Sequence, residues 1–420
     1  MGTLQLVRNT LTLILAGGQG ERLYPLTRDR SKPAVPFGSA YRIIDFTLSN
    51  CINSGLRQIY VLTQYKSYSL DKHLQRGWNI FSYESGEFLY RIPPQHRVGQ
   101  KWYEGTADAV YQNIYLLENR KPEHVLILSG DHIYRMDYTE LLRFHQTHEG
   151  SLSLSAAVVP REGADQFGIL EVDENWRVVG FEEKPADPKT IPGDPDHCLV
   201  NMGVYLFDTA RMVREISNDA RRSESHHDFG HNIIPALVAD GEVYAYPFRD
   251  EETGKTAYWR DIGTLDSYFE TAMDLVSRTP DFDLYDPQWL FRAWQPPVPP
   301  CKSVHGFTED GTLPGIVEDS IVGGGSVVSG GHVERSILGR SVRINSYSKV
   351  SESILMDDVT VGRYAQLNRC IVDKNVVIPE GMKIGFDAER DRQLFKVSAS
   401  GIVVVPKGMD LGGLSEAGGD

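Results

Sequence analysis

A run of glycines near the N-terminus, followed by two cations, has the composition of a phosphate-binding loop. Residues 15–23 read LAGGQGERL, and Lys32 follows ten residues after Arg22. Glycines let a backbone bend closely around phosphate groups and point its N–H groups at them, and a guanidinium matches phosphate oxygens. The glycines alone fit an ordinary turn about equally well, and the run matches neither the dinucleotide fingerprint nor the GxxxxGK(S/T) loop. The two cations favour nucleotide binding.

Charged residues farther along the chain have types that suit a metal ion or a second anion. Asp131 follows an apolar run and a glycine, so it lies where a strand should end. A carboxylate there can hold Mg²⁺ against phosphates, although an isolated Asp is more often a helix cap. Lys184 lies between Glu183 and a proline; a surface ion pair is the alternative to anion binding. Adjacent side chains in the run HHD (226–228) rarely face one ion, so we expect a turn there.

The elements that must position these residues follow from hydrophobic periodicity. Three short apolar runs predict buried strands over 11–16, 58–63 and 124–129. Thr106 can cap a helix between the second and third strands. The apolar residues at helical spacing in that helix are Val110, Ile114 and Leu117. Alternation of strand and helix predicts an α/β domain with a largely parallel sheet. Ligands bind outside the carboxyl ends of such strands, so the glycine loop and Asp131 should share one edge.

The composition changes after about residue 275. A proline-rich segment, 294–300, predicts a semi-rigid extended linker. Apolar residues then recur in steps of six and eleven, a pattern that repeats about every 17 residues: Ile321, Val327, Val333, Ile344, Val350, Val361, Leu367, Ile378 and Ile384. A second series agrees, with Ser-Ile-Val/Leu or Cys-Ile-Val starting at residues 320, 336, 353 and 370.

Such hexapeptide periodicity is typical of a parallel β-helix, in which stacked coils share one core. A β-sandwich with evenly spaced strands is the weaker alternative. The expected domains are therefore an α/β domain over 1–275, a linker over 276–303 and a β-helix over 304–420.

The motifs, taken in order, resemble a known family. GGxGxRL followed by KPAVPFG resembles the signature loop of sugar-1-phosphate nucleotidyltransferases. Further runs are similar to the ADP-glucose pyrophosphorylases within that family: RIIDF, LSNCINSG, QRGW, WYEGTADAV, GDHIY, FEEKP, HDFG and WRDIGT. The resemblance implies a Rossmann-like nucleotidyltransferase domain with a mostly parallel mixed sheet, followed by a left-handed parallel β-helix. It also implies that ATP and α-D-glucose 1-phosphate react to give ADP-glucose and pyrophosphate, with Mg²⁺ as cofactor.

The resemblance also implies roles for individual residues. The expected catalytic residues are Arg22, Lys32 and Asp131. The expected ATP-binding residues are Leu15, Gly17, Gly18, Gly20, Gln64, Gly105 and Thr106. Those expected to bind glucose 1-phosphate are Tyr103, Gly168, Glu183, Lys184 and Asn201, the last where some members have Ser. The expected metal ligands are Asp131 and Asp261.

Members of this family are typically tetramers that anionic metabolites regulate. We therefore expect a homotetramer and anionic effectors. Asp29 stands where many members have Lys or Arg, so a sugar-phosphate activator should act weakly or differently here. The nearby residues that can still bind an anion are Arg28, Arg30 and Arg42.

Overall composition narrows the alternatives. The net charge of −14 predicts repulsion of nucleic acid and anionic membranes. The four cysteines are widely spaced with no CxxC pair, which argues against a cysteine zinc site and fits a reducing cytoplasm. No apolar run is long enough to cross a bilayer. A non-catalytic regulatory subunit or another sugar-1-phosphate nucleotidyltransferase remains possible, but the full set of expected catalytic and metal-binding residues favours an active enzyme.

Overall fold

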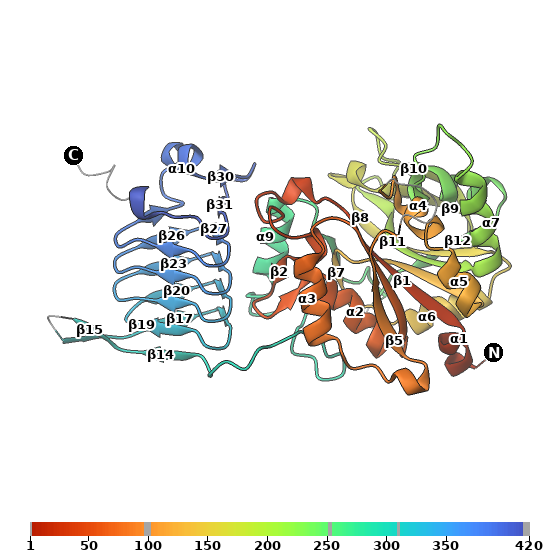
Figure 1. Cartoon of the computed structure of the whole chain (residues 1–420). Coiled ribbons are helices and arrows are strands. Elements are labelled where there is room, and N and C mark those ends of the chain that lie inside the picture. The colour runs from red at the N-terminus through yellow and green to blue at the C-terminus, as the bar shows by residue number, and fades with distance from the viewer. Residues whose placement is uncertain (1, 96–101, 251–253, 309–310, 415–420) are drawn as a thin grey trace.

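The computed structural model describes residues 2–95, 102–250, 254–308 and 311–414. Residues 309–310 and 415–420 of the expected C-terminal domain therefore lie outside the described residues. Figure 1 shows an α/β part and a stack of short strands side by side, with α9 (Leu265–Asp274) and β2 (Pro36–Phe37) between them.

A nine-stranded mixed sheet organises the α/β part. Seven strands follow the order β10-β9-β11-β6-β1-β4-β5, β8 pairs with β11, and β12 pairs with β8. Their bounds are β1 (Thr10–Ala16), β4 (Gln58–Thr63), β5 (Phe88–Ile92), β6 (His124–Ser129), β8 (Leu152–Pro160), β9 (Gly168–Val172), β10 (Val178–Glu183), β11 (His197–Asp208) and β12 (Val243–Pro247). The three strands expected from apolar runs are thus confirmed.

The parallel part of this sheet is the part that carries the glycine loop. β6, β1, β4 and β5 run parallel to one another, as β12 and β8 do. β11 runs antiparallel to β6, β8 and β9, and β10 runs antiparallel to β9. The carboxyl ends of β1, β4 and β6 therefore meet at one edge, whereas the antiparallel strands extend the sheet beyond it.

Helices cover both faces of the sheet. One face packs apolar residues of α2 (Ile43–Asn53), α3 (Tyr68–Gly77) and α6 (Tyr138–Gln146). The opposite face packs α4, α5, α7 and α8. The bounds of the remaining helices are α1 (Thr3–Arg8), α4 (Thr106–Tyr111), α5 (Tyr115–Arg120), α7 (Thr209–Asp219), α8 (Ile234–Ala239) and α10 (Ala388–Leu394). Two small pairs complete this part: β2 with β3 (Tyr41–Arg42), and β7 (His132–Tyr134) with β13 (Trp259–Asp261).

The single helix expected after Thr106 is wrong in two respects. The N-cap residue is Gly105, because the Thr106 hydroxyl instead donates to Asp228 and accepts from the Phe229 N–H. The helix also divides into α4 and α5. The Asn113 side chain donates to the carbonyl of Ala109 four residues earlier, so it competes with the backbone at the break.

The C-terminal part is a parallel β-helix, as expected. Each face is a ladder of parallel strands, one strand per coil. The first ladder contains β14 (Lys302–Val304), β19 (Val327–Ser329), β22 (Arg343–Ile344), β25 (Thr360–Val361) and β28 (Val377–Ile378). The second contains β17 (Ile316–Glu318), β20 (His332–Glu334), β23 (Lys349–Ser351), β26 (Gln366–Asn368) and β29 (Lys383–Ile384).

The third ladder contains β18 (Ile321–Val322), β21 (Ile337–Leu338), β24 (Ile354–Leu355), β27 (Cys370–Val372) and β31 (Val403–Val405), with β30 (Lys396–Val397) antiparallel at its end. A side hairpin is formed by β15 (Gly306–Thr308) and β16 (Gly311–Leu313). The first strand of the stack thus begins at Lys302, inside the segment expected to be linker.

The repeat phase at Val327 is wrong by one residue. Val328, not Val327, is the buried side chain of β19, and it stacks in register on Ile344. The stacked core residues Val328 and Val333 are one residue closer in sequence than Ile344 and Val350, on which they stack. Gly330 occupies the turn between β19 and β20 with a φ of 66°, a conformation that glycine adopts without strain.

The isoleucines of the Ser-Ile-Leu series join the β-helix to the α/β part. We call Ile337, Ile354 and Ile371 the isoleucine column. These side chains pack in one cluster with α9 and the nucleotide-loop flank. The residue after each isoleucine points into the β-helix core instead. Alternation along each short strand therefore assigns one residue to the domain junction and the next to the core.

Candidate functional site

The glycine loop and Asp131 meet at one sheet edge, as the sequence predicted. Leu15 on β1 pairs in register with Ser129, the last residue of β6. Ala16 pairs with Thr63, the last residue of β4. Because these strands are parallel, the segments that follow them leave the sheet on the same side. Gln64 and Asp131 therefore flank the loop that starts at Gly17.

Lys32 lies between two carboxylates at this edge. Its Nζ is 2.9 Å from Asp131 Oδ2 and 2.8 Å from Asp261 Oδ1. The Lys32 side chain is only 10% exposed, and it begins a short 3-10 helix of residues Lys32–Ala34. Asp261 ends β13, which pairs antiparallel with β7 directly after Asp131. The long-range pairing of β13 with β7 thus brings Asp261 close to Asp131, and the 3-10 helix places Lys32 between them.

The electrostatics keep this cluster charged. Burial alone would raise the pKa of Asp131, but the charges of Lys32 and His132 and a hydrogen bond from Ser129 hold it well below its usual range. Burial likewise opposes charge on Lys32, but the two carboxylates raise its pKa. Both partners are therefore ionised near neutral pH.

His132 is a site residue that the sequence did not identify. Its Nε2 lies 3.6 Å from Asp131 Oδ1 and 3.7 Å from Asp261 Oδ1. The register of β13 and β7 places His132 directly opposite Asp261. The run GDHIY indicates that His132 is near Asp131, but nothing local in the sequence indicates the pairing with β13.

The two carboxylates fit a divalent cation. Carboxylate oxygens are the ligands that Mg²⁺ prefers in proteins. Asp131 and Asp261 direct oxygens at the same ammonium group, so they can also direct them at an ion beside it. The ionised state of Asp131 suits that role, because a metal ligand must be deprotonated.

Arg22 reaches the same cluster from the glycine loop. Its Nη1 donates to Gln166 Oε1 at 2.9 Å. A Cβ on Gly263 would lie 3.2 Å from both Arg22 Nη2 and Asp261 Oδ2. Glycine at this position of the WRDIGT run therefore leaves room for the guanidinium and the carboxylate to approach each other.

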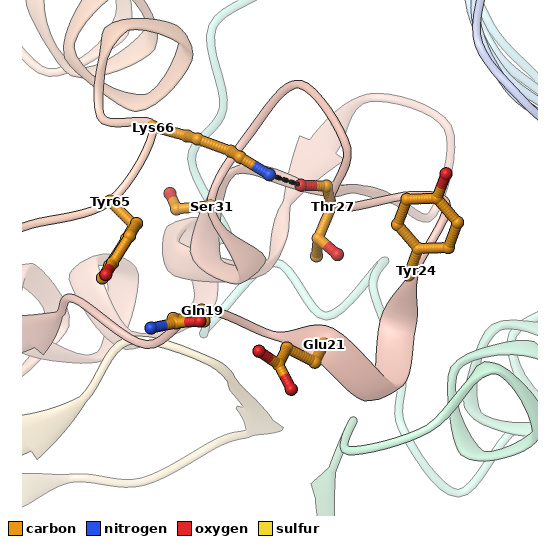
Figure 2. Close-up of a pocket in the computed structure, with 7 residues that line it drawn as sticks. All are labelled: Gln19, Glu21, Tyr24, Thr27, Ser31, Tyr65 and Lys66. Atoms are coloured by element: carbon orange, nitrogen blue, oxygen red, sulfur yellow. Dashed lines mark hydrogen bonds between the residues drawn. The ribbon is translucent and has the colours of Figure 1, made fainter.

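The glycine loop forms one wall of a pocket of about 410 Å³ (Figure 2). Gly20 adopts a left-handed conformation with a φ of 64°, and Thr27 Oγ1 donates to its carbonyl at 2.9 Å. Lys66 Nζ donates to the Thr27 carbonyl at 2.9 Å across the pocket (Figure 2). The residues that line this pocket are Gln19, Glu21, Tyr24, Thr27, Ser31, Tyr65 and Lys66. Lys66 could not be predicted from the sequence, because it lies in a loop without a phosphate-binding motif.

The other residues expected to bind ATP differ in how closely they contact the glycine loop. A Cβ on Gly17 would lie 3.2 Å from Gln64 Cβ, so the Gln64 side chain packs directly on the loop. Gln64 Nε2 also donates to the Tyr103 carbonyl at 3.4 Å. A Cβ on Gly105 would lie 2.2 Å from the His227 carbonyl, so only glycine fits there. The Thr106 hydroxyl donates to Asp228 and accepts from the Phe229 N–H.

Three of the residues expected to bind glucose 1-phosphate, Gly168, Glu183 and Asn201, lie on the antiparallel strands, whereas Lys184 directly follows β10 and Tyr103 precedes α4. Glu183 on β10 pairs with Gly168 on β9, and a Cβ on Gly168 would lie 2.8 Å from Glu183 Oε2. Lys184 Nζ is 3.4 Å from Glu183 Oε1, and its side chain is 55% exposed. Asn201 on β11 donates to Tyr205 Oη at 2.8 Å and accepts from the Gly203 N–H at 3.0 Å. Glu183 and Lys184 thus form a charged pair whose lysine is exposed to solvent.

The three arginines expected to bind an effector are not equivalent. Arg30 is buried, and its Nη2 makes two hydrogen bonds of 2.9 and 3.0 Å to Asp373 of the β-helix. In this structure Arg30 is therefore engaged by the β-helix and does not face solvent as an effector-binding residue would. Arg28 pairs with Asp29 at the surface and also donates to the Lys407 carbonyl.

Arg42 lines a small groove between the two domains. It donates to the Ala34 carbonyl and to Ser69 Oγ, each at 2.8 Å. Arg340 and Lys374 of the β-helix line the same groove. Burial is the main cause that lowers the pKa of Arg42, to about 10.

Within the described residues, no helix combines the length and apolar character needed to cross a bilayer.

Comparisons with known proteins cover both parts of the chain. Residues 11–278 match the family described as Nucleotidyl transferase, and residues 299–405 match the family described as GlmU-like, C-terminal hexapeptide. A glucose-1-phosphate adenylyltransferase of Rhodopirellula baltica is 50% identical, over 96% of this chain and 91% of that protein. Glucose-1-phosphate adenylyltransferase 2 of Vibrio cholerae is 48% identical over 96% and 98%. The glucose-1-phosphate adenylyltransferase of Koribacter versatilis is 48% identical over 96% of each.

Proposed function

The chain belongs to the glucose-1-phosphate adenylyltransferase family of nucleotidyltransferases, and from this premise we propose how its residues carry out the reaction. The enzyme joins ATP and glucose 1-phosphate to give ADP-glucose and pyrophosphate. ADP-glucose is the activated glucose for glycogen synthesis. The observation that carries the proposed mechanism is the convergence of Lys32, Asp131 and Asp261 beside the glycine loop.

The reaction needs charge neutralisation more than proton transfer. A phosphate oxygen of glucose 1-phosphate, already ionised, attacks the α-phosphorus of ATP, and the bond from that phosphorus to the bridging oxygen of pyrophosphate breaks. No general base is needed. Holding two polyanions in line against their repulsion is therefore the main task of the protein.

The glycine loop and two cations bind the nucleotide in this proposal. Backbone N–H groups of residues 17–20 face the triphosphate, and Arg22 and Lys32 neutralise its charge. Gln64 contacts the adenine base, consistent with its packing against Gly17. Leu15, Gly105 and Thr106 shape this side of the pocket, Thr106 through its bond to Asp228 rather than through phosphate.

The sugar phosphate binds on the antiparallel side. Lys184 contacts its phosphate, and its exposed, singly paired ammonium is available to do so. Glu183 accepts hydrogen bonds from glucose hydroxyls, while Tyr103, Gly168 and Asn201 complete the subsite. Asn201 would exchange one of its present hydrogen bonds for a substrate hydroxyl.

Enzymes of this kind use a divalent metal, and Asp131 and Asp261 are the residues that would hold it here. We propose that the ion is Mg²⁺, which would supply positive charge to the phosphates when bound. Lys32 pairs with both carboxylates and would hold them in position for the ion.

Asp131→Asn tests this mechanism directly. Loss of one such electrostatic group should lower kcat by about 10²–10³, because the amide cannot replace the carboxylate charge. Pyrophosphate release is measured at saturating ATP, glucose 1-phosphate and Mg²⁺. The matched control is Asp187→Asn, an acid whose side chain is 87% exposed. Near-wild-type turnover of Asp131→Asn would exclude the proposed role.

The adenine preference needs its own assay. Parallel reactions with ATP, UTP and GTP should show ATP to be the strongly preferred substrate. Equal rates with UTP or GTP would contradict the base assignment to Gln64. Absence of pyrophosphate release with every nucleotide would indicate a regulatory subunit instead.

We also propose that anionic metabolites regulate the enzyme through the groove at Arg42, Arg340 and Lys374. Three cations in one groove, with Asp357 as a partner, offer an anion a local positive potential on an acidic protein. Arg42→Gln should weaken any response to phosphorylated metabolites while leaving the unstimulated rate nearly unchanged. An unaltered response would place the effector elsewhere.

Assembly and location complete the proposal. We propose a homotetramer that forms through the β-helix, where Tyr347 and Tyr364 stack at 4.7 Å and Tyr364 is half exposed. Light scattering should give four times the 47.1 kDa chain mass. The free cysteines, three of them buried, fit a cytoplasmic location.

A further inference from the structure

Two histidines and an aspartate converge at the sheet edge opposite to the glycine loop. Asp208 Oδ1 lies 3.2 Å from His124 Nδ1 and 3.3 Å from His145 Nε2. One ligand atom from each of the three residues lies within 4.8 Å of the other two. The two imidazole side chains are 8% and 4% exposed, whereas the Asp208 side chain is 46% exposed.

The fold builds this cluster from three elements. His124 begins β6 and Asp208 ends β11, and the two residues are directly opposed in the antiparallel register. Cross-strand partners point to the same face, so both side chains meet α6. His145, in the last turn of α6, covers them. Because these three positions are far apart in the sequence, no sequence motif indicates the site.

The two distances from Asp208 Oδ1 match those between ligands of a tetrahedral metal ion, and the two histidine nitrogens lie within 4.8 Å of each other. Zinc is held by nitrogen and oxygen ligands at about 2.0–2.1 Å, which separates neighbouring ligand atoms by about 3.3 Å. Both measured separations agree with that value. His145 also has the outer partner that metal-bound histidines need, because its Nδ1 is 2.8 Å from Ser153 Oγ.

His124 supplies an independent indication. Its residue is 94% buried, with 6% of its surface exposed, and its Nδ1 makes no well-directed hydrogen bond with any described residue. That nitrogen nevertheless lies 3.2 Å from Asp208 Oδ1. A buried nitrogen that faces a carboxylate in poor hydrogen-bond geometry is unfavourable, and a cation between the two could coordinate both.

We propose that His124 Nδ1, His145 Nε2 and Asp208 Oδ1 bind one Zn²⁺ ion. Imidazole and carboxylate donors suit zinc, whereas all-oxygen sites suit Mg²⁺. The half-exposed Asp208 leaves a path from solvent, and water takes the fourth position. The ion fastens α6 to the ends of β6 and β11, so its role is to stabilise the fold and not to act in adenylyl transfer.

A proton could hold the same three groups without any metal. In that arrangement a protonated imidazole pairs with Asp208, whose pKa the two histidines lower against the opposing effect of burial. The two explanations differ in a measurable way, because only the zinc site binds one equivalent of metal with an affinity that depends on Asp208.

Calorimetric titration of the chelator-treated full chain with ZnCl₂ tests the proposal. Saturating Mg²⁺ is present, so that Asp131 and Asp261 are occupied. Wild type should bind one equivalent per chain, and Asp208→Asn should weaken that binding at least about 10-fold. The same titration with Co²⁺ should give the intense visible absorption of a tetrahedral centre. Thermal unfolding should show a zinc-dependent rise in Tm for wild type but not for Asp208→Asn.

The matched control is His197→Gln. His197 faces Asp194 at 2.9 Å in a similar histidine–aspartate pair, but it has no third ligand nearby among the described residues. This variant should bind zinc as wild type does. Pyrophosphate release by Asp208→Asn reports whether that variant folds. Identical zinc titrations of wild type and folded Asp208→Asn would overturn the proposal, as would equal weakening in His197→Gln.

Discussion

Lys32 and its two carboxylates carry a net charge of minus one where two polyanions must bind. One ammonium cannot balance Asp131 and Asp261, and all three groups are at least partly buried. Repulsion of phosphate by this cluster would oppose the reaction unless further positive charge is added. Arg22, Lys66 and a divalent ion are the available sources. The charge count therefore supports a metal independently of the family comparison.

Lys184 is the residue whose role separates the two substrates. Lys184→Gln removes the charge that we assign to glucose 1-phosphate, so KM for glucose 1-phosphate should rise by about 10-fold or more while KM for ATP changes little. Initial-rate kinetics with each substrate varied in turn give both constants. Lys189→Gln is the control, because Lys189 is an exposed lysine that pairs with Glu171 in the same way. Equal increases in both KM values would contradict the assignment.

For single residues, the sequence predicts which ones belong to the site better than it predicts which side chains they contact. Asp131 and the glycine loop were predictable because each follows a recognisable strand. The contact of His132 with Asp261 depends on the pairing of β7 with β13 across more than a hundred residues. The ion pair of Arg30 with Asp373 depends on a tertiary contact between the two domains. Neither leaves a local pattern.

Each short strand of the third ladder places one residue in the junction between the domains and the next residue in the β-helix core. In the third ladder, the isoleucine column faces the α/β part and the following residue fills the coil interior. The hexapeptide period was visible in the sequence, but it does not say which apolar residues point outward. The shorter turn at Gly330 also shifted the phase at Val327, since a repeat pattern fixes spacing but not the length of each turn.

Ile354→Ala tests the isoleucine column. Ile354 is 4% exposed at the junction. Truncation should lower the free energy of unfolding by about 2–5 kcal/mol through lost burial and a residual cavity. Guanidinium denaturation measures the change. Val377→Ala, at a position 64% exposed on the same β-helix, should have little effect. Similar losses in both variants would mean that the column is not a packed interface.

Lys374 gives the interdomain groove a pH dependence. Burial, with help from Arg42 and Arg30, lowers the pKa of Lys374 to about 8, although Asp357 at 2.6 Å opposes this. The unfolded chain keeps this proton up to its ordinary pKa of 10.5. Between pH 8 and 10.5 the unfolded state therefore binds more protons, so this group contributes stability that increases with pH.

The expected measurement is a difference between variants. Relative to Lys374→Met, wild type should gain up to roughly 3 kcal/mol of stability from pH 7.5 to 10.5, at about 1.36 kcal/mol per pKa unit. Denaturant titrations at several pH values give the comparison. Lys383→Met, at an exposed position on the same β-helix, should show no such pH-dependent difference. A difference that stays constant with pH would show that the pKa is not lowered.

At the scale of the whole molecule, the buried ion pair of Arg30 and Asp373 joins the α/β part to the β-helix. Their side chains are 4% and 1% exposed. Arg30→Met leaves a buried carboxylate without its cation, so the free energy of unfolding should fall by about 3–5 kcal/mol. The double variant Arg30→Met/Asp373→Asn removes both charges and should recover most of that loss. Denaturation of the single and double variants measures the coupling.

The exposed pair of Arg28 and Asp29 is the matched control. It lies two residues away, with side chains 42% and 39% exposed. Arg28→Met should change stability by no more than about 1 kcal/mol. A double variant no more stable than Arg30→Met would show that the buried pair is not the source of the loss.

The Arg30–Asp373 contact also sets an order of events during synthesis. The ribosome produces Arg30 343 residues before its partner. Through that interval the α/β part can assemble its sheet, but the segment that carries Lys32 has not yet received the contact that fixes its path. The isoleucine column, which shields the same flank from water, is also made late. A nascent chain therefore contains every residue of the glycine loop before the β-helix residues that contact its flank have been made.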